Sequence, residues 1–428
     1  MHTLEQLRSG KLKGIRRLDL AADLTEFPRE IFDLADSLEV LNLSGNRLTR
    51  LPDDLPQLYK LKVIFCSENP FSELPEVLGA CPALEMVGFK ACQIQNVTDA
   101  ALPARLRWLI LTDNRLHQLP VTLGQRPRLQ KLMLSGNHLS SLPESLANAH
   151  NLELLRLAAN RLQTLPDWLG ELPRLAWLAF SGNPCSPFPS TVSTRAYYQE
   201  EVQLGQLLGQ GASGLIHAGT LQDGSEVAVK LFKGQVTSDG LPESEMAACL
   251  AAGEHPNLLA VKGILHSEHS PRPAMLMERL APGYRTLAGP PTLRTCTRDH
   301  YPEGWAIPTE QALRIARDTA SVVSHLHTRG LLHGDLYGHN LLVDDRGHTL
   351  LSDFGAATFI NPDNANAQGG RLRRLETRAF GCLLEELLDH CPVEDQPNLQ
   401  PLRMLQQACL DEQVNNRPDF QAIHAALS

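Results

Sequence analysis

Three oxygen-bearing side chains lie close together in the run LHGDLYGHNLLVDDRGHTLLSDFG, which begins at Leu332. Asp335 and Asn340 are five residues apart, and Asp353 follows thirteen residues after the asparagine. Carboxylate and amide oxygens are ligands that Mg²⁺ accepts, commonly together with phosphate oxygens. A solvated acidic turn would explain neither the Phe-Gly pair after Asp353 nor a lysine upstream. The spacing therefore predicts a site at which magnesium bridges phosphate groups.

Three glycines upstream of this run could let the backbone approach a phosphate group. The run LGQGASGLIHAG, which begins at Leu208, places Gly209, Gly211 and Gly214 between two strand-like segments. Glycines let the backbone approach a phosphate closely and point its N–H groups at it. Taken by itself, the run is better explained by a glycine-rich hairpin with no ligand.

A lysine and a glutamate follow the glycines. The segment EVAVK ends an alternating strand at Lys230, and Glu245 lies on a predicted helix that ends before the His-Pro-Asn turn at residues 255–257. A lysine on a strand and a glutamate on the next helix can pair and so hold the ammonium group at the phosphates of ATP. Glu243 is an alternative partner, but the spacing to the turn favours Glu245.

These motifs follow one another in a fixed order over about 145 residues, and in that order they resemble the motifs of protein kinases. The resemblance covers roughly Gln199 to Ser428 and implies a bilobal α+β domain that uses ATP and Mg²⁺. By this resemblance Asp335 is the catalytic base, and Lys230 is the phosphate anchor held by Glu245. The implied magnesium ligands are Asn340 and Asp353.

The resemblance also assigns the surroundings of the nucleotide. Met277 is similar to the gatekeeper residue, and Glu278 and Leu280 to the hinge that contacts adenine. The implied remainder of the ATP site comprises the glycine hairpin and the side chains that enclose the ring, namely Gly209, Gly211, Gly214, Ile216, Ala228 and Leu342.

Four features depart from the protein kinase pattern. Gly334 stands in place of the arginine before the catalytic aspartate, so we expect no switch by phosphorylation of the activation loop. Tyr337 replaces a lysine found near the transferred phosphate, and Glu376 replaces the aspartate that begins the buried helix of the large lobe. Only 23 residues separate Asp353 from Glu376, and no Ala-Pro-Glu motif occurs. These departures affect the segment on which, by the resemblance, a protein substrate would dock.

Three functions are consistent with these motifs. The favoured one is an active serine/threonine protein kinase. A pseudokinase scaffold is the second, and intact Lys230, Asp335, Asn340 and Asp353 argue against it. The third is a kinase for a small metabolite, because His-Gly-Asp is similar to aminoglycoside and choline kinases. The repeats described next argue against a metabolite, since a small substrate needs no large protein-binding surface.

The first half of the chain repeats itself every 22 or 23 residues. The clearest copies are LEVLNLSGNRLTRLP from Leu38, LQKLMLSGNHLSSLP from Leu129 and LELLRLAANRLQTLP from Leu152, and they resemble leucine-rich repeats. Leucines that alternate along a short strand would point into a solenoid core. The asparagine at the ninth position would satisfy buried backbone groups, with Cys92 in its place in the fourth copy. The eight copies begin at Ile15, Leu38, Leu61, Leu84, Leu106, Leu129, Leu152 and Leu175.

The strand register predicts which residues face the concave side of this horseshoe. Apolar side chains recur there, and we expect them to form an exposed surface that binds a protein partner. Burial against the kinase-like domain, or tolerated apolar scatter, would also explain them. The predicted partner-binding residues are Val40, Phe65, Met86, Trp108, Met133, Leu154 and Trp177.

The two resemblances together imply an α/β fold class, with a leucine-rich-repeat solenoid over residues 1–190, a linker over 191–198 and the kinase-like domain over 199–428. Composition sets the remaining expectations. The net charge of −9 gives no basic surface for nucleic acid. No run of about 18 apolar residues occurs, so we expect no membrane span and a cytoplasmic location. The architecture resembles bacterial leucine-rich-repeat kinases more than plant receptor kinases.

Overall fold

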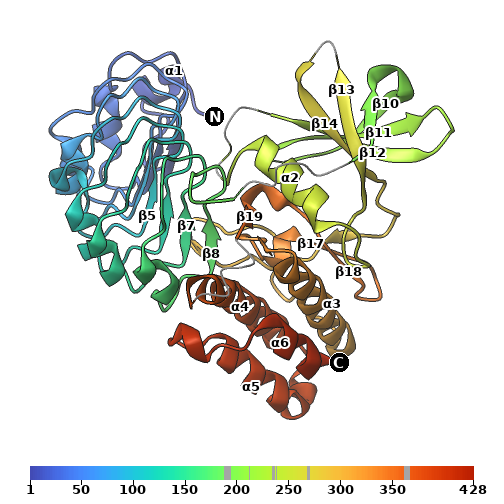
Figure 1. Cartoon of the computed structure of the whole chain (residues 1–428). Helices are drawn as coiled ribbons and strands as arrows, with labels where there is room; N and C mark the ends of the chain where they lie inside the picture. The colour runs from blue at the N-terminus through green and yellow to red at the C-terminus, as the bar shows by residue number, and fades with distance from the viewer. Residues whose placement is uncertain (188–193, 212, 234–236, 238, 268–269, 361–366) are drawn as a thin grey trace. The chain divides into compact units, whose positions relative to one another are not determined.

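The computed structural model describes residues 1–187, 194–211, 213–233, 237, 239–267, 270–360 and 367–428 (Figure 1). The chain divides into two compact units. The first contains Met1–Arg174 and Asn183–Cys185, and the second contains Leu175–Gly182 and Ser186–Ser428. This division differs from the predicted boundary at residue 190, because the strand segment of the eighth repeat makes its contacts with the second unit. Among the described residues, no helix is long and apolar enough to cross a membrane.

Short parallel strands, one from each repeat, form the sheet of the solenoid. The central residue of each strand points into the core, and Leu18, Leu41 and Ile64 are fully buried. The strands follow one another in chain order. They are β1 (Arg17–Asp19), β2 (Val40–Asn42), β3 (Val63–Phe65), β4 (Met86–Gly88), β5 (Trp108–Ile110), β6 (Lys131–Met133), β7 (Leu154–Arg156) and β8 (Trp177–Ala179).

The return path of most repeats is a 3₁₀ helix that begins after a proline. Pro75, Pro120, Pro143 and Pro166 each occupy the position before such a helix, where no strand partner needs the missing N–H. A short helix, α1 (Leu4–Arg8), begins at a capping box on Thr3. The 3₁₀ helices are η1 (Arg29–Leu34), η2 (Leu55–Gln57), η3 (Glu76–Ala80), η4 (Asp99–Ala101), η5 (Val121–Gln125), η6 (Glu144–Asn148) and η7 (Asp167–Glu171).

The asparagine ladder predicted from the repeats is confirmed. Asn46 Nδ2 donates to the carbonyls of Leu20 and Leu43, and its Oδ1 accepts from the backbone N–H of Leu24. The same contacts to a neighbouring repeat recur in later copies. In the fourth copy Cys92 Sγ donates to Cys66 O at 3.5 Å. Each amide therefore provides hydrogen bonds to buried backbone groups of its own repeat and of the neighbouring one.

The predicted exposed apolar surface on the concave side is wrong for four of its seven residues. Val40, Phe65 and Trp108 are half-buried. Side chains in register on neighbouring strands lie only about 4.8 Å apart, so they shield one another. Phe65, for example, leans over Gly88, where an added Cβ would lie 2.5 Å from the Phe65 ring. The four that are buried are Met86, Met133, Leu154 and Trp177.

The second unit contains a six-stranded sheet with the order β10-β11-β12-β14-β13-β9. Its core includes Tyr197, Val227, Val229 and Leu276. The strand β9 lies within the predicted linker and pairs in parallel with β13, and residues 191–193 of that linker lie outside the described residues. The elements are β9 (Ala196–Tyr198), β10 (Val202–Gln210), β11 (Gly214–Leu221), β12 (Glu226–Phe232), α2 (Pro242–Ala252), β13 (Val261–Ser267) and β14 (Ser270–Glu278).

A mainly helical lobe completes the second unit (Figure 1). Helix α3 packs against α6, and α4 packs against α5. Two small sheets, β15-β17-β18 and β16-β19, carry the loops that follow His333 and Ser352. The elements are β15 (Arg285–Thr286), α3 (Thr309–Thr328), β16 (Leu331–Leu332), β17 (Leu341–Val343), β18 (Thr349–Leu351), β19 (Thr358–Phe359), α4 (Ala367–Asp389), α5 (Gln400–Cys409) and α6 (Phe420–Leu427).

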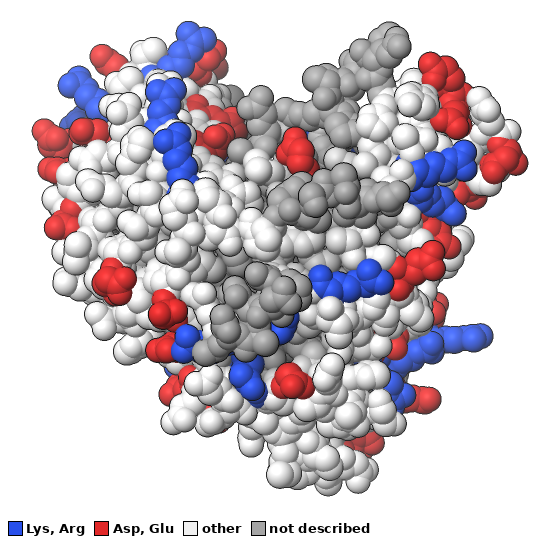
Figure 2. All heavy atoms as spheres, in the orientation of Figure 1, with Lys and Arg blue, Asp and Glu red and all other residues white. Residues whose placement is uncertain are grey.

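Charged side chains of both signs are interspersed on the face shown in Figure 2. Several basic side chains of the repeats pair with acidic neighbours, such as Arg17 with Asp19 and Lys62 with Glu39. Such exposed pairs contribute little to the stability of the fold.

Candidate active site

The glycine run forms the tip of the antiparallel β10–β11 pair. Gly209 lies opposite Ile216, and the N–H of Gly211 donates to the carbonyl of Gly214 at 3.0 Å. A Cβ added to Gly209 or Gly211 would meet nothing within 4 Å, whereas one on Gly214 would lie 2.5 Å from Leu231 O. Gly214 is therefore required by packing, while the first two glycines border open space.

The residues predicted to surround a nucleotide share one face of the six-stranded sheet. Ile216 lies opposite Lys230 on β12, and Ala228 lies opposite Met277 on β14. Residues directly opposite on neighbouring strands, and residues two apart on one strand, point to the same side. Gly209, Ile216, Ala228, Lys230 and Met277 therefore line the same face.

The other three residues predicted to contact adenine lie at the end of β14, just beyond it and on β17. Glu278 is exposed at the end of β14, and Leu280 is half-buried just beyond it. Leu342 is half-buried on β17, where it lies opposite Leu350 and Thr286. The assignment of these three residues to a nucleotide site stays a prediction.

Lys230 forms a buried ion pair with Glu245, which lies in the first turn of α2. The two side chains are only 10% and 3% exposed, while Glu243, the alternative partner, is exposed. Burial alone would lower the pKa of Lys230, but the carboxylates of Glu245 and Asp353 raise it above the ordinary value. The ammonium group therefore stays charged and lies within reach of both acidic groups.

Asn340 orients the loop that carries Asp335. Its Nδ2 donates to the backbone carbonyl of Asp335 and to Oδ2 of the same residue, both at 2.8 Å. The amide oxygen of Asn340 consequently faces away from Asp335. Ser352 binds the carbonyl of Asn340 through its N–H at 2.9 Å and its hydroxyl at 2.8 Å, which ties this loop to the residue before Asp353.

Asp353 adopts a left-handed backbone conformation with φ of 55°. Such a conformation costs a residue with a side chain about 1–3 kcal/mol and clusters at functional sites. Asp353 Oδ1 accepts from Gly355 N at 3.1 Å. A Cβ added to Gly355 would lie 3.1 Å from Asp353 Oδ1 and 3.8 Å from Glu245 Oε2. Gly355 therefore lies between the Asp353 carboxylate and the Lys230–Glu245 pair.

Glu376 of α4 contacts the loop that carries Asp335. Its Oε1 accepts from Gly334 N at 2.7 Å, and its Oε2 lies 2.7 Å from His327 Nε2 of α3. Burial would raise the pKa of this carboxyl, but the hydrogen bond and the charge of His327, with His333 and Gly334, hold it below the ordinary value. The glutamate thus reaches the loop backbone although the protein kinase pattern has an aspartate there.

Gly334 has no room for the arginine of the protein kinase pattern. Its φ is 75°, a conformation that favours glycine. A Cβ would also lie 2.7 Å from each of two backbone oxygens, those of Ala356 and Leu178. Leu178 belongs to β8, so the strand segment of the eighth repeat occupies the space beside the catalytic loop.

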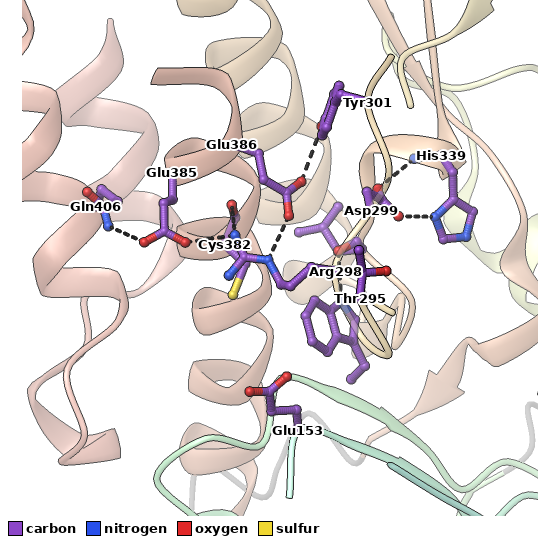
Figure 3. A network of polar contacts seen from close by, with 12 residues as sticks. Glu153, Thr295, Arg298, Asp299, Tyr301, His339, Cys382, Glu385, Glu386 and Gln406 are labelled. Carbon is purple, nitrogen blue, oxygen red and sulfur yellow. Dashed lines mark hydrogen bonds and ion pairs between the residues drawn. The ribbon is translucent and has the colours of Figure 1, made fainter. Parts of the chain in front are cut away.

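Sequence analysis missed a buried pair beside this loop (Figure 3). His339 Nδ1 lies 2.7 Å from Asp299 Oδ1, and the His339 N–H donates to Asp299 Oδ2 at 3.0 Å. Burial would lower the pKa of His339, but Asp299, then Asp335 and Asp353, raise it. The histidine was visible within the motif, but its partner lies 40 residues away with no motif of its own.

The segment that carries Asp299 is fixed to α4 by ion pairs, also shown in Figure 3. Arg298 contacts Glu386 and Glu385, each at 2.7 Å, and Tyr301 donates to Glu386 at 3.2 Å. These contacts hold the residue that orients His339.

The oxygen atoms of the predicted site can be compared with the ligands that a magnesium ion takes when it binds a nucleotide. Among the described residues, no group of three or more His, Cys, Asp and Glu side chains is placed to hold a metal by itself. Asn340 and Asp353 would provide two oxygen ligands, which fits Mg²⁺ because this ion usually takes its other ligands from water and phosphate. The residues present therefore fit a magnesium ion that binds together with a nucleotide.

Comparisons with known protein families match repeats in the first half of the chain and a kinase domain in the second half. The model described as "Protein tyrosine and serine/threonine kinase" matches residues 202–390. Models described as "Leucine rich repeat" match residues 104–162, 127–184 and 37–58. The kinase match spans the glycine hairpin, the lysine and both acidic motifs.

Several curated protein kinases are similar to part of the chain. CBL-interacting protein kinase 22 of Oryza sativa subsp. japonica is 31% identical over 183 residues, 39% of this chain and 38% of that protein. A probable receptor-like protein kinase of Arabidopsis thaliana is 30% identical over 163 residues, covering 37% and 35%. Tyrosine-protein kinase Fer of Mus musculus is 25% identical over 274 residues, covering 54% and 31%. The chain thus spans about a third of the length of each of these relatives. Its resemblance to bacterial proteins stays a prediction.

Proposed function

This chain is a leucine-rich-repeat protein with a protein kinase domain, and we propose that it transfers the γ-phosphoryl group of ATP to serine or threonine hydroxyls of a protein held by the repeats. One observation carries the proposal. The buried Lys230–Glu245 pair lies close to Asp353. Ser352, the residue before Asp353, is hydrogen-bonded to Asn340, and Asn340 is hydrogen-bonded to Asp335.

The nucleotide would lie against the shared face of the six-stranded sheet. In this proposal the N–H groups near Gly209 and Gly211 approach the phosphates, and the Lys230 ammonium offsets phosphate charge while Glu245 holds it in place. The adenine ring would lie between the apolar side chains of Ile216 and Ala228 on one side and Leu342 on the other, next to Met277, Glu278 and Leu280.

Asn340 and Asp353 would hold the magnesium ion, which when bound neutralises charge on the phosphate oxygens. The left-handed conformation of Asp353 and the hydrogen bonds of Asn340 fix both side chains before any ligand arrives. Such preorganisation lowers the cost of assembling the site at the moment of reaction.

Asp335 would orient the acceptor hydroxyl and take its proton as the phosphoryl group passes in line between oxygens. Its Oδ2 accepts from Asn340, which fixes the plane of the carboxylate. Asp335 is a weak base by itself, so positioning and charge supply most of the effect.

Two alternatives are separated from this proposal by their chemistry. A pseudokinase scaffold would not need the strained Asp353 or the intact Lys230–Glu245 pair. A metabolite kinase would not need repeats. The choice between serine/threonine and tyrosine is part of the proposal, since the similar proteins include a tyrosine kinase; phosphoamino acid analysis of the labelled product decides it.

The repeats would recruit the substrate through the concave side. Three half-buried apolar residues there, Val40, Phe65 and Trp108, keep part of their surface accessible. Large apolar and aromatic side chains dominate the binding energy of protein interfaces. Capture of the same phosphorylated protein by the wild type but not by Phe65→Ala would support this role, and equal capture by both would contradict it. The predicted cytoplasmic location stays part of the proposal and is tested by fractionation of expressing cells.

The direct test incubates the purified chain with radiolabelled ATP, Mg²⁺ and generic protein substrates. We expect label on serine or threonine, and loss of at least about a hundredfold with Asp335→Asn, because the base no longer accepts a proton. Transfer by the wild type that only equals transfer by Asp335→Asn would contradict the enzyme. Label on free alcohols but never on protein would favour the metabolite kinase.

A further inference from the structure

The strand of the eighth repeat contacts the catalytic loop directly. Trp177, the first residue of β8, is only 2% exposed. Its ring stacks on the ring of Tyr337 with centroids 4.3 Å apart and planes 6° from parallel. The indole Nε1 donates to the carbonyl of Leu336 at 3.0 Å. A single side chain of β8 thus contacts the two residues that follow Asp335.

A second ring contact joins Tyr337 to His339. The ring of His339 lies 4.9 Å from that of Tyr337, tilted by 33°. His339 is in turn held by Asp299 and immediately precedes Asn340. The stack therefore spans the loop from Leu336 to His339, which are the residues that connect Asp335 to Asn340.

Residues that follow β8 contact the segment after Asp353. The N–H of Phe180 donates to the hydroxyl of Thr358 at 3.2 Å, and Ser186 donates to the carbonyl of Phe359 at 3.4 Å. Together with the close approach of Leu178 O to Gly334, these contacts join β8 and the residues after it to both motif-bearing loops. Residues 175–182 accordingly belong to the compact unit of the kinase domain.

We infer that β8 is a working part of the catalytic domain and that Trp177 is a positioning residue for the Asp335–Asn340 loop. The inference rests on the proposed phosphoryl transfer. With Gly334 in place of arginine, contacts of β8 provide the order that a phosphorylated loop provides in other kinases. The stack restricts Tyr337, and the indole hydrogen bond restricts Leu336, so Asp335 is held at a fixed position relative to Asn340.

The test compares Trp177→Ala with Trp177→Phe in the full chain. Loss of the stack should lower kcat by about tenfold to a hundredfold, because a displacement of about 1 Å at the reacting groups has an effect of that size. The KM for ATP should change little, since the contacts of Trp177 with Leu336 and Tyr337 lie on the Asp335 loop and the proposed nucleotide site lies on the six-stranded sheet. Trp177→Phe keeps an aromatic ring for the stack and should recover most of the lost kcat.

The matched control is Trp168→Ala. Trp168 is a half-buried tryptophan in η7, nine residues earlier and within the first unit. We expect it to leave kcat and the KM for ATP unchanged. An equal fall in kcat for both variants, or no fall for Trp177→Ala, overturns the inference.

Hydrogen–deuterium exchange gives a readout that does not need activity. In Trp177→Ala the amides of residues 333–340 should exchange at least about tenfold faster, while those of β12 keep the wild-type rate. Unchanged exchange in the loop overturns the inference even if the wild type transfers no phosphate. If Trp177→Ala does not fold, Trp177→Phe provides the test, because it keeps an aromatic ring but removes the hydrogen bond to Leu336 O. The amides around Leu336 should then exchange faster, and unchanged exchange there overturns the inference.

Discussion

The repeats and the catalytic loop satisfy their buried polar groups in opposite ways. In the solenoid, one asparagine per repeat makes nearly the same contacts to the neighbouring repeat, as at Asn46 and Asn137. In the kinase domain each contact occurs once and joins residues far apart, as between Glu376 and His327 or Asp299 and His339. A change in the ladder should therefore weaken stability locally, whereas a change in the site should remove a function that no other residue duplicates.

Lys230→Met is expected to have the largest effect on phosphoryl transfer. The ammonium group is lost, and we expect phosphoryl transfer to fall by at least about a hundredfold to a thousandfold because a preorganised charge at the phosphates is missing. The chain should stay folded, as measured by circular dichroism. Lys262→Met, at an exposed lysine of β13, is the control and should keep full activity. Unchanged transfer by Lys230→Met would refute its assignment.

Glu376→Ala should weaken the loop and the fold together. It removes the partners of Gly334 N and His327 Nε2 in a fully buried environment. Breaking such a pair costs about 3–5 kcal/mol, so urea unfolding should shift strongly and activity should fall. A loss below about 1 kcal/mol would show that the loop does not depend on this carboxylate.

The ladder should respond differently. Asn137→Ala leaves the N–H of Leu116 without its acceptor. It also removes one of the two amide donors to each of the carbonyls of Leu111 and Leu134, which keep their bonds from Asn114 and Asn160. We expect a loss of about 1–3 kcal/mol in the unfolding of the repeats, with the transfer rate per folded molecule unchanged. A fall in kcat as large as that of the site variants would erase the contrast between the two regions.

Acid should weaken the site through Glu376. The pKa of this carboxyl is lower in the folded chain than its ordinary value of 4.5, so its contribution to stability is present above that pH and is lost as the pH falls through the folded pKa. The stability difference between the wild type and Glu376→Gln, from urea unfolding, should therefore shrink below about pH 4.5. A stability difference that grows on acidification would mean that folding raises the pKa of Glu376 instead of lowering it.

The smallest expected effect is a gain. Cys92 occupies the ladder position of the fourth repeat and contacts Cys66 O at 3.5 Å through sulfur. Cys92→Asn should restore amide hydrogen bonds and raise the unfolding free energy of the repeats by about 0.5–1 kcal/mol. Destabilisation would mean that the local backbone has adapted to the smaller thiol.

The sequence predicted the features that recur or keep a fixed spacing. The repeat strands, the asparagine ladder and the order of repeats followed by a kinase domain are of this kind. The exposure of Met86 and Leu154 was predicted wrongly, because burial depends on how neighbouring repeats lean on one another. The pairs Trp177–Tyr337 and Asp299–His339 could not be predicted, because their members are 160 and 40 residues apart and only folding brings them together.

Calorimetric titration of ATP into the purified chain, with and without Mg²⁺, tests the central claim most directly. If Asn340 and Asp353 hold the ion that binds together with the nucleotide, the wild type should bind ATP more tightly with Mg²⁺, and Asp353→Asn should lose that gain. Identical magnesium dependence in the wild type and Asp353→Asn would contradict the account of the site.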